Sequence, residues 1–153
     1  MITLQDYKPK ITVMLDEALA RFATENPTVS PTMIALYCCP WTGLLSLCLN
    51  STDTATQHEK NCPDFEYVGY EEMCFDEWQE EYESEAPEVK LPDRHTYIHD
   101  HDSDDGDEAF NKPFYKFLVA FAQDYFKQSR IKLRPTWIGV QMLDSGLAKF
   151  WKM

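Results

Sequence analysis

The sequence predicts an α+β fold: a single domain, residues 1–153, with a small and mainly antiparallel sheet. Two observations lead to this prediction. Apolar residues recur with helical spacing in one segment near the N-terminus and in another near the C-terminus. Between these segments, two apolar runs flank a proline–glycine turn. We therefore expect a central hairpin that is packed by an N-terminal helix and by a long aromatic C-terminal helix.

The first helix is predicted over residues 9–25. Its apolar face has the spacing i, i+4, i+7, i+8 and i+11, at Ile11, Leu15, Ala18, Leu19 and Phe22. Pro9 suits a first turn. Asn26-Pro27 should end the helix, because a residue that precedes proline avoids the helical region.

The hairpin follows the first helix. The runs MIALYCC and GLLSLCLN are joined by the turn Pro40-Trp41-Thr42-Gly43. Nearly every residue of both runs is apolar, so we expect both strands to be central in the sheet and covered on both faces. The polar residues 52–60 predict a short helix that is capped by Thr52 or Asp53.

A second short helix is predicted where Phe75, Trp78 and Tyr82 have the spacing i, i+3, i+7, which would place aromatic side chains inside and acidic ones outside. Residues 86–109 are poor in apolar residues and contain two prolines and a glycine. This composition predicts a long acidic surface loop.

The strongest helical pattern covers residues 111–130. Its stripe is Phe114, Phe117, Leu118, Phe121 and Tyr125, which is typical of a helix packed on a core. Pro113 suits a first turn of this helix. The run WIGVQML then predicts a strand, and SGLAKFWKM a short terminal segment.

The composition argues against several classes of protein. The N-terminal residues do not resemble a secretory signal, and no apolar run reaches the length of a membrane-spanning helix, so we expect a cytoplasmic protein. The five cysteines are odd in number and contain no CxxC pair. They predict reduced, mostly buried thiols rather than a zinc site or a disulfide framework.

The negative charge is concentrated in one segment. Residues 71–108 contain sixteen acidic residues and two basic ones, whereas the rest of the chain contains ten acidic and twelve basic residues. Nucleic acid and acidic membrane surfaces would be repelled by such a segment. A basic protein is the partner that its charge predicts.

The stretch HDHDSDDGDE at residues 99–108 resembles a calcium-binding loop, but the match fails twice. Counted from Asp100, the glycine falls one position late, at Gly106, and the twelfth position is Asn111 instead of glutamate. His95, His99 and His101 lie within seven residues and leave a metal-binding protein or a metal-dependent enzyme as the alternative function, although solvated histidines are the simpler interpretation.

No catalytic motif emerges, so no catalytic residue and no cofactor are predicted. GxSxG is absent, and Cys38 and Cys39 lie in an apolar strand that would keep their thiols neutral. We predict a partner-binding surface instead, with Trp41 as a possible anchor. Its residues are Glu80, Glu81, Glu83, Glu85, Asp100, Asp102, Asp104, Asp105, Asp107, Glu108 and Trp41.

Three short motifs resemble a bacterial family of small cytoplasmic proteins that is known only as a domain of unknown function. They are Ala35-Leu36-Tyr37 in the first strand, Asn50 and Thr52 after the second, and Trp78 followed by Tyr82-Glu83 in the acidic aromatic stretch. The resemblance covers roughly residues 10–85, and Ser51 interrupts the usual Asn-Thr pair. Such families resemble immunity proteins that are encoded beside toxin genes. The resemblance therefore implies a binding function and no catalytic residues.

Overall fold

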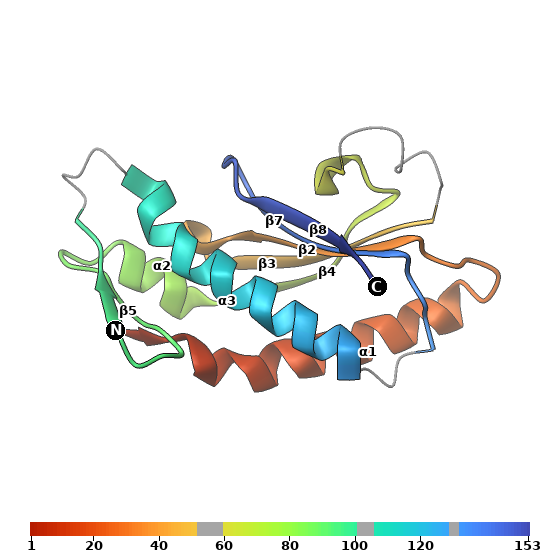
Figure 1. The fold of residues 1–153 in the computed structure, drawn as a ribbon, viewed down its shortest axis with the longest axis horizontal. Helices are drawn as coiled ribbons and strands as arrows, with labels where there is room; N and C mark the ends of the chain where they lie inside the picture. Colours follow the sequence, from red (N-terminus) through yellow and green to blue (C-terminus); the bar gives the residue numbers. More distant parts are fainter. Residues whose placement is uncertain (52–59, 101–105, 129–131) are drawn as a thin grey trace.

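The computed structural model describes residues 1–51, 60–100, 106–128 and 132–153. In these ranges the chain forms three α-helices and two β-sheets (Figure 1). The helices are α1 (Lys8–Glu25), α2 (Asp76–Tyr82) and α3 (Gly106–Gln128). The strands are β1 (Ile2–Thr3), β2 (Met33–Cys39), β3 (Leu44–Asn50), β4 (Tyr67–Cys74), β5 (Glu88–Lys90), β6 (Thr96–Ile98), β7 (Trp137–Met142) and β8 (Ala148–Lys152). The predicted α+β fold is confirmed.

The larger sheet has the strand order β4-β3-β2-β7-β8. Strands β2 and β7 are parallel, and the other neighbours in this sheet are antiparallel. The predicted hairpin, β2 and β3, occupies the middle of the sheet, as its apolar sequence indicated. The 3-10 turn η2 (Pro40–Thr42) joins the two strands and ends at Gly43, which has a φ of 71° in the left-handed region.

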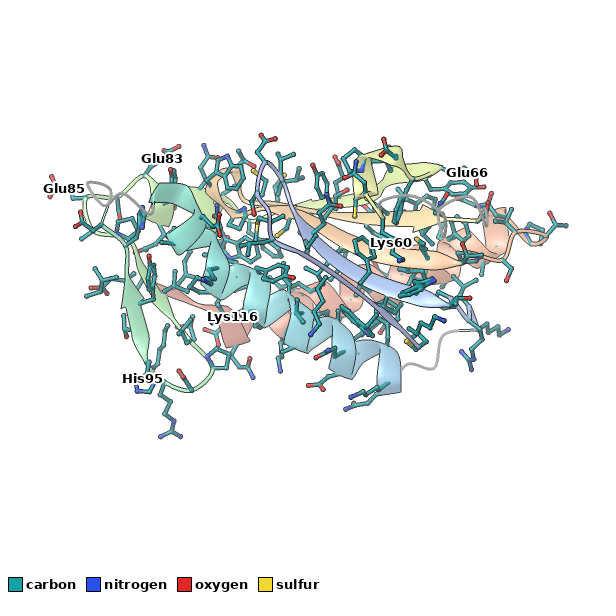
Figure 2. All side chains as sticks on the ribbon, turned by 45° about the horizontal axis from the view of Figure 1, so that its top comes forward. Lys60, Glu66, Glu83, Glu85, His95 and Lys116 are labelled. Carbon is teal, nitrogen blue, oxygen red and sulfur yellow. The ribbon has the colours of Figure 1, made fainter. Side chains whose placement is uncertain are left out.

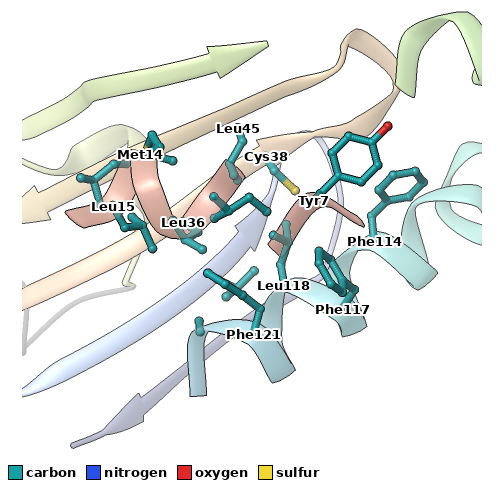
Figure 3. Close-up of a cluster of buried hydrophobic side chains, with 14 of the residues drawn as sticks. Tyr7, Met14, Leu15, Leu36, Cys38, Leu45, Phe114, Phe117, Leu118 and Phe121 are labelled. Carbon is teal, nitrogen blue, oxygen red and sulfur yellow. The ribbon is translucent and has the colours of Figure 1, made fainter. Parts of the chain in front are cut away.

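Side chains of the central strands alternate between two hydrophobic clusters. Ile34, Leu36 and Cys38 of β2 join the larger cluster, which packs against α1 and α3 (Figure 3). Met33 and Ala35 join the smaller cluster on the opposite face, together with Phe65. The hairpin is therefore covered on both faces, as predicted. The strand period of two explains the division between the clusters.

Helix α1 confirms the first predicted helix to within one residue. All five residues of its predicted apolar face are buried. Pro9 lies in the first turn, and Asn26 is the C-cap residue, whose backbone N–H donates to the Phe22 carbonyl over 2.9 Å. The helical spacing of apolar residues was thus sufficient to predict this element.

Helix α3 begins at Gly106, five residues before its predicted start. Pro113 consequently lies inside the helix instead of in its first turn, which corrects the prediction. An internal proline removes one backbone hydrogen bond and costs about 3 kcal/mol in a helix. The additional N-terminal residues bury Phe110, and the contacts of its phenyl ring offset part of that cost.

The smaller sheet has the order β1-β5-β6, with β1 parallel and β6 antiparallel to β5. Two of its strands lie within residues 86–109, so the prediction of a continuous acidic loop there is wrong. Val89 and Ile2 are buried in the same cluster as the large sheet. Each strand of this sheet has only two or three residues, so a few β-prone residues around the turn at Pro92 were enough to form β5 and β6.

Further differences concern β4 and β8. The segment before α2 forms the long edge strand β4, and the predicted terminal segment forms the edge strand β8. Four cysteines are buried free thiols, as expected, whereas Cys74 is exposed on β4. The helix predicted at residues 52–60 falls almost wholly outside the described residues. No helix in the described ranges is both long and apolar enough to span a bilayer.

Candidate functional site: the acidic end

One end of the molecule brings together α2, the smaller sheet and the beginning of α3 (Figure 1). We call this region, comprising residues 76–100 and 108–112, the acidic end. Residues 76–100 contain nine carboxylates and two basic side chains, Lys90 and Arg94. Figure 2 shows Glu83, Glu85 and His95 at this end, far from Lys60 and Glu66 at the other.

Helix α2 carries four of these nine carboxylates on a well-packed backbone. Trp78 is fully buried, and its ring lies 4.7 Å from that of Phe114, 5.2 Å from that of Tyr7 and 4.3 Å from that of Phe75. With Trp78 inside, the helical period leaves Asp76, Glu77, Glu80 and Glu83 exposed. Asp76 and Glu77 also lie in the first turn, where the helix dipole favours negative charge.

The predicted binding carboxylates on and after α2 differ in their contacts. Glu81 is half-buried and accepts hydrogen bonds from the Met1 amino group and, over 2.7 Å, from the backbone N–H of Glu88. Glu83 accepts from the Gln79 amide over 2.9 Å. Among the described residues, no cation pairs with Glu80, Glu83 or Glu85. These three exposed carboxylates are the ones that an incoming cation can reach.

A hollow of about 380 Å³ separates α2 from the N-terminal turn η1 (Leu4–Tyr7). Asp6, Glu77, Glu80 and Glu81 line it, and Lys10 pairs with Glu77 over 3.6 Å at its rim. Burial raises the pKa of the Tyr7 phenol in its wall to about 12, and the carboxylates of Glu77, Asp6 and Glu81 add to this increase. The Met1 amino group and Lys10 also line the hollow, so it holds four carboxylates and two cations.

The remaining predicted residues are distributed as follows. Asp100 and Glu108 are exposed beside β6 and in the first turns of α3. His101, Asp102, Asp104 and Asp105 lie outside the described residues, as does the side chain of Asp107. Trp41 is half-buried in the η2 turn, against which α2 packs, and its ring joins the main core. The structure thus brings Trp41, α2, Asp100 and Glu108 to the same end.

The two described histidines have opposite environments. His95 is exposed, and its Nδ1 lies 3.0 Å from a carboxylate oxygen of Asp93. This hydrogen bond raises the pKa of His95 and lowers the pKa of Asp93. His99, in contrast, is only 2% exposed and is surrounded by the rings of Tyr82, Tyr97 and Phe110. The expectation of solvated histidines is therefore wrong for His99.

The metal alternative gains no support from the described part of the chain. No group of three histidine, cysteine or carboxylate side chains is arranged there to hold an ion. Around His99 the neighbours are aromatic rings, which do not supply the carboxylate or imidazole ligands that a divalent cation prefers.

Two features of the surface were not predicted from the sequence. Ile98, on β6, is 60% exposed in the middle of the acidic end. A groove of about 910 Å³ runs between α1 and α3, and in it the Tyr125 hydroxyl donates to Asp16 over 2.7 Å. Burial and then Asp16 raise the pKa of Tyr125. The triplets Glu-Val-Lys and Thr-Tyr-Ile, on either side of Pro92-Asp93, could have indicated the strands β5 and β6. The groove had no such signal in the sequence, because it depends on how the two helices pack.

Comparison with known proteins found no matching family model, no matching curated protein and no matching solved structure. The function must therefore be argued from the geometry and charge of this chain.

Proposed function

We propose that this chain is a cytoplasmic binding protein of the immunity type, which neutralises a basic bacterial toxin or effector through its acidic end. The observation that carries the proposal is the set of exposed carboxylates Glu80, Glu83 and Glu85, on and just after α2, without paired cations among the described residues. The motifs that resemble a family close to immunity proteins point to the same function.

The physical basis of the proposal is electrostatic complementarity. A toxin that cleaves nucleic acid or binds phosphate carries a basic active site, because its substrate is an anion. A surface of fixed carboxylates attracts such a site and raises the association rate by about 10–1,000-fold at low salt. The hollow lined by Asp6, Glu77 and Glu80 is of a suitable size for one lysine or arginine side chain of the partner.

Anchoring of α2 supports affinity as well as rate. Trp78 holds the helix against Phe114 and Tyr7, so the backbone that carries the carboxylates is already ordered when the partner arrives. A binding surface whose backbone is already ordered avoids the cost of ordering that segment on association. Half-buried Trp41, in the turn against which α2 packs, would add an aromatic anchor of the kind enriched at binding hot spots.

The experiment uses the protein encoded by the gene adjacent to this one. We expect co-expression of this chain to restore the growth of cells that produce that protein. We also expect the association rate of the purified pair, measured by stopped-flow fluorescence, to fall steeply with salt. The triple variant Glu80→Gln, Glu83→Gln and Glu85→Gln should slow association about tenfold and flatten the salt dependence.

A matched variant removes the same number of charges elsewhere: Glu17→Gln, Asp124→Asn and Asp144→Asn, on α1, on α3 and after β7. If both triple variants slow association equally, net charge is responsible and the acidic end is not the binding surface. Absence of both binding and growth protection would refute the proposed function itself.

A further inference from the structure

We infer that the free edge of β6 is a docking site for an extended, basic segment of a protein partner, which adds to the smaller sheet as a fourth strand. The inference rests on the proposed function, because it specifies the partner of the same acidic end. It also rests on a separate observation, the backbone geometry of Thr96 and Ile98.

The hydrogen-bond register shows which backbone groups of β6 face outward. The Leu91 N–H donates to the His95 carbonyl and the His99 N–H donates to the Pro87 carbonyl, each over 2.8 Å. The pairs 91–95 and 87–99 are therefore the hydrogen-bonded pairs, and between them Val89 pairs with Tyr97 in the same way. The backbone N–H and C=O groups of Thr96 and Ile98 consequently point away from β5.

No other described strand pairs with this side of β6, which is the last strand of its sheet. The Ile98 side chain is 60% exposed, and that of Thr96 is also exposed. An exposed strand edge with an apolar side chain is a template for pairing with another chain. A strand that added here would satisfy up to four backbone groups and cover part of Ile98.

The two edge strands of the larger sheet carry features that oppose strand addition. Lysines 149 and 152 lie on the edge strand β8, and lysine on an edge discourages pairing. On β4, the pairing with β3 is irregular between Leu47 and Leu49, and the Glu71 carboxylate accepts from the backbone N–H of Glu72. Strand β6, Thr96-Tyr97-Ile98, has neither a charged residue nor a register shift.

The charge around β6 determines the kind of strand that fits. Glu88 lies opposite Ile98 and Lys90 opposite Thr96 in the ladder, Asp93 and Arg94 lie in the turn before β6, and Asp100 follows it. Over residues 76–100 the nine carboxylates outnumber the two basic side chains, which favours a basic strand.

Glu88, Ile98 and Asp100 share one face of the sheet, because directly opposite residues and alternate residues of a strand point the same way. A segment that alternates basic and apolar residues would place its basic residues on that face, with their alkyl chains over Ile98 and their charges beside the carboxylates. Its apolar residues would lie on the other face, beside Tyr97. A second copy of β6 would bring a second acidic end and be repelled.

The test uses a short synthetic peptide in which lysine and valine alternate, and a control peptide of the same sequence in which every backbone nitrogen is methylated. The two carry equal charge, but the control has no backbone N–H on either side and cannot donate to the carbonyls of β6. Amide hydrogen exchange of the uniformly labelled protein is followed by NMR. We expect the lysine–valine peptide to slow exchange at Thr96 and Ile98 by about tenfold or more, and the control peptide to leave it unchanged.

Two variants at one position separate the backbone from the side chain. Ile98→Pro removes an outward N–H that takes no part in pairing with β5. This variant should weaken the binding of the lysine–valine peptide about tenfold or more. Ile98→Thr keeps that N–H and should weaken binding only about threefold. The exchange measurement on the unaltered protein decides the question if Ile98→Pro does not fold.

Several outcomes would overturn the inference. Equal binding of both peptides, with shifts confined to α2, would refute strand addition while the charged surface of the proposed function stands. Protection at β4 or β8 instead of β6 would place the docking edge elsewhere. Failure of the lysine–valine peptide to protect Thr96 and Ile98 would also refute it, and the proposed function would still be judged separately with the neighbouring gene's protein.

Discussion

Replacement of Gly43 by alanine should destabilise the fold more than its small size suggests. Gly43 has a φ of 71°, and an added Cβ would lie 2.2 Å from the carbonyl oxygen of Phe75 and 2.9 Å from its carbonyl carbon. Both contacts involve backbone atoms, which cannot rotate away as a side chain does. The same glycine accepts the Phe75 N–H over 2.7 Å, so the two segments cannot separate without breaking this bond.

The magnitude follows from these contacts. A left-handed conformation costs a residue with a Cβ about 1–2 kcal/mol. Loss of the bond from Phe75 adds about 1 kcal/mol. We therefore expect Gly43→Ala to lower the free energy of unfolding by about 2–3 kcal/mol and the Tm by about 4–12 °C.

Urea unfolding followed by tryptophan fluorescence measures the effect directly. Gly146→Ala is the matched control, because no atom lies within 4 Å of the Cβ that it would add. The control should stay within about 0.5 kcal/mol of the unaltered protein. If Gly43→Ala also stays within that range, the close contact between the η2 turn and Phe75, at the start of α2, does not constrain the fold.

Three further predictions follow from individual side chains. Trp78→Ala should lower the free energy of unfolding, measured in urea, by about 3–5 kcal/mol. Trp78→Phe should lower it by clearly less, because the buried ring contacts are partly kept. Equal losses for the two variants would contradict this prediction. By NMR titration, His95 should have a raised pKa that Asp93→Asn returns toward its usual value. Since the pKa of His95 is raised in the folded state, this pair favours folding while Asp93 is ionised and His95 is protonated. Its effect is lost as the pH rises through the folded-state pKa of His95 or falls through that of Asp93. A thiol reagent should modify Cys74 rapidly and the four buried cysteines only after unfolding, and rapid reaction of a second thiol would contradict the burial described above.

The long elements of the fold could be predicted from sequence because each has a distinct apolar pattern. The faces of α1 and α3 repeat with the helical period, whereas β2 and β3 are continuous apolar runs on either side of a proline–glycine turn. The short strands β5 and β6 lack such a pattern. Their three residues each are stabilised by neighbours distant in sequence, since β5 pairs with β1 at the N-terminus.

The start of α3 was missed for a related reason. Pro113 indicated a first turn by local rules, but burial of Phe110 one turn earlier extends the helix through it.

The candidate site was only partly predictable. Its carboxylates were evident from composition, and the spacing of Phe75, Trp78 and Tyr82 placed them on the outer side of a helix. The sequence did not indicate that Glu81 would be used within the fold, that His99 would be enclosed by aromatic rings, or that Ile98 would be exposed. Each of these depends on tertiary contacts between segments that are not adjacent in the chain.

The parallel pairing of β2 with β7 has a consequence for the order in which the chain can fold. Cys38 and Met142, which meet in this pairing, are 104 residues apart. The hairpin of β2 and β3 can form early because its contacts are local, but one apolar edge of β2 remains uncovered until β7 has been synthesised and has closed a long loop. Contacts of such sequence separation slow folding, and an uncovered apolar strand favours aggregation. The rate-limiting event in folding should therefore be the closure of β7 onto β2, and nascent chains that end before Trp137 should depend most on chaperones.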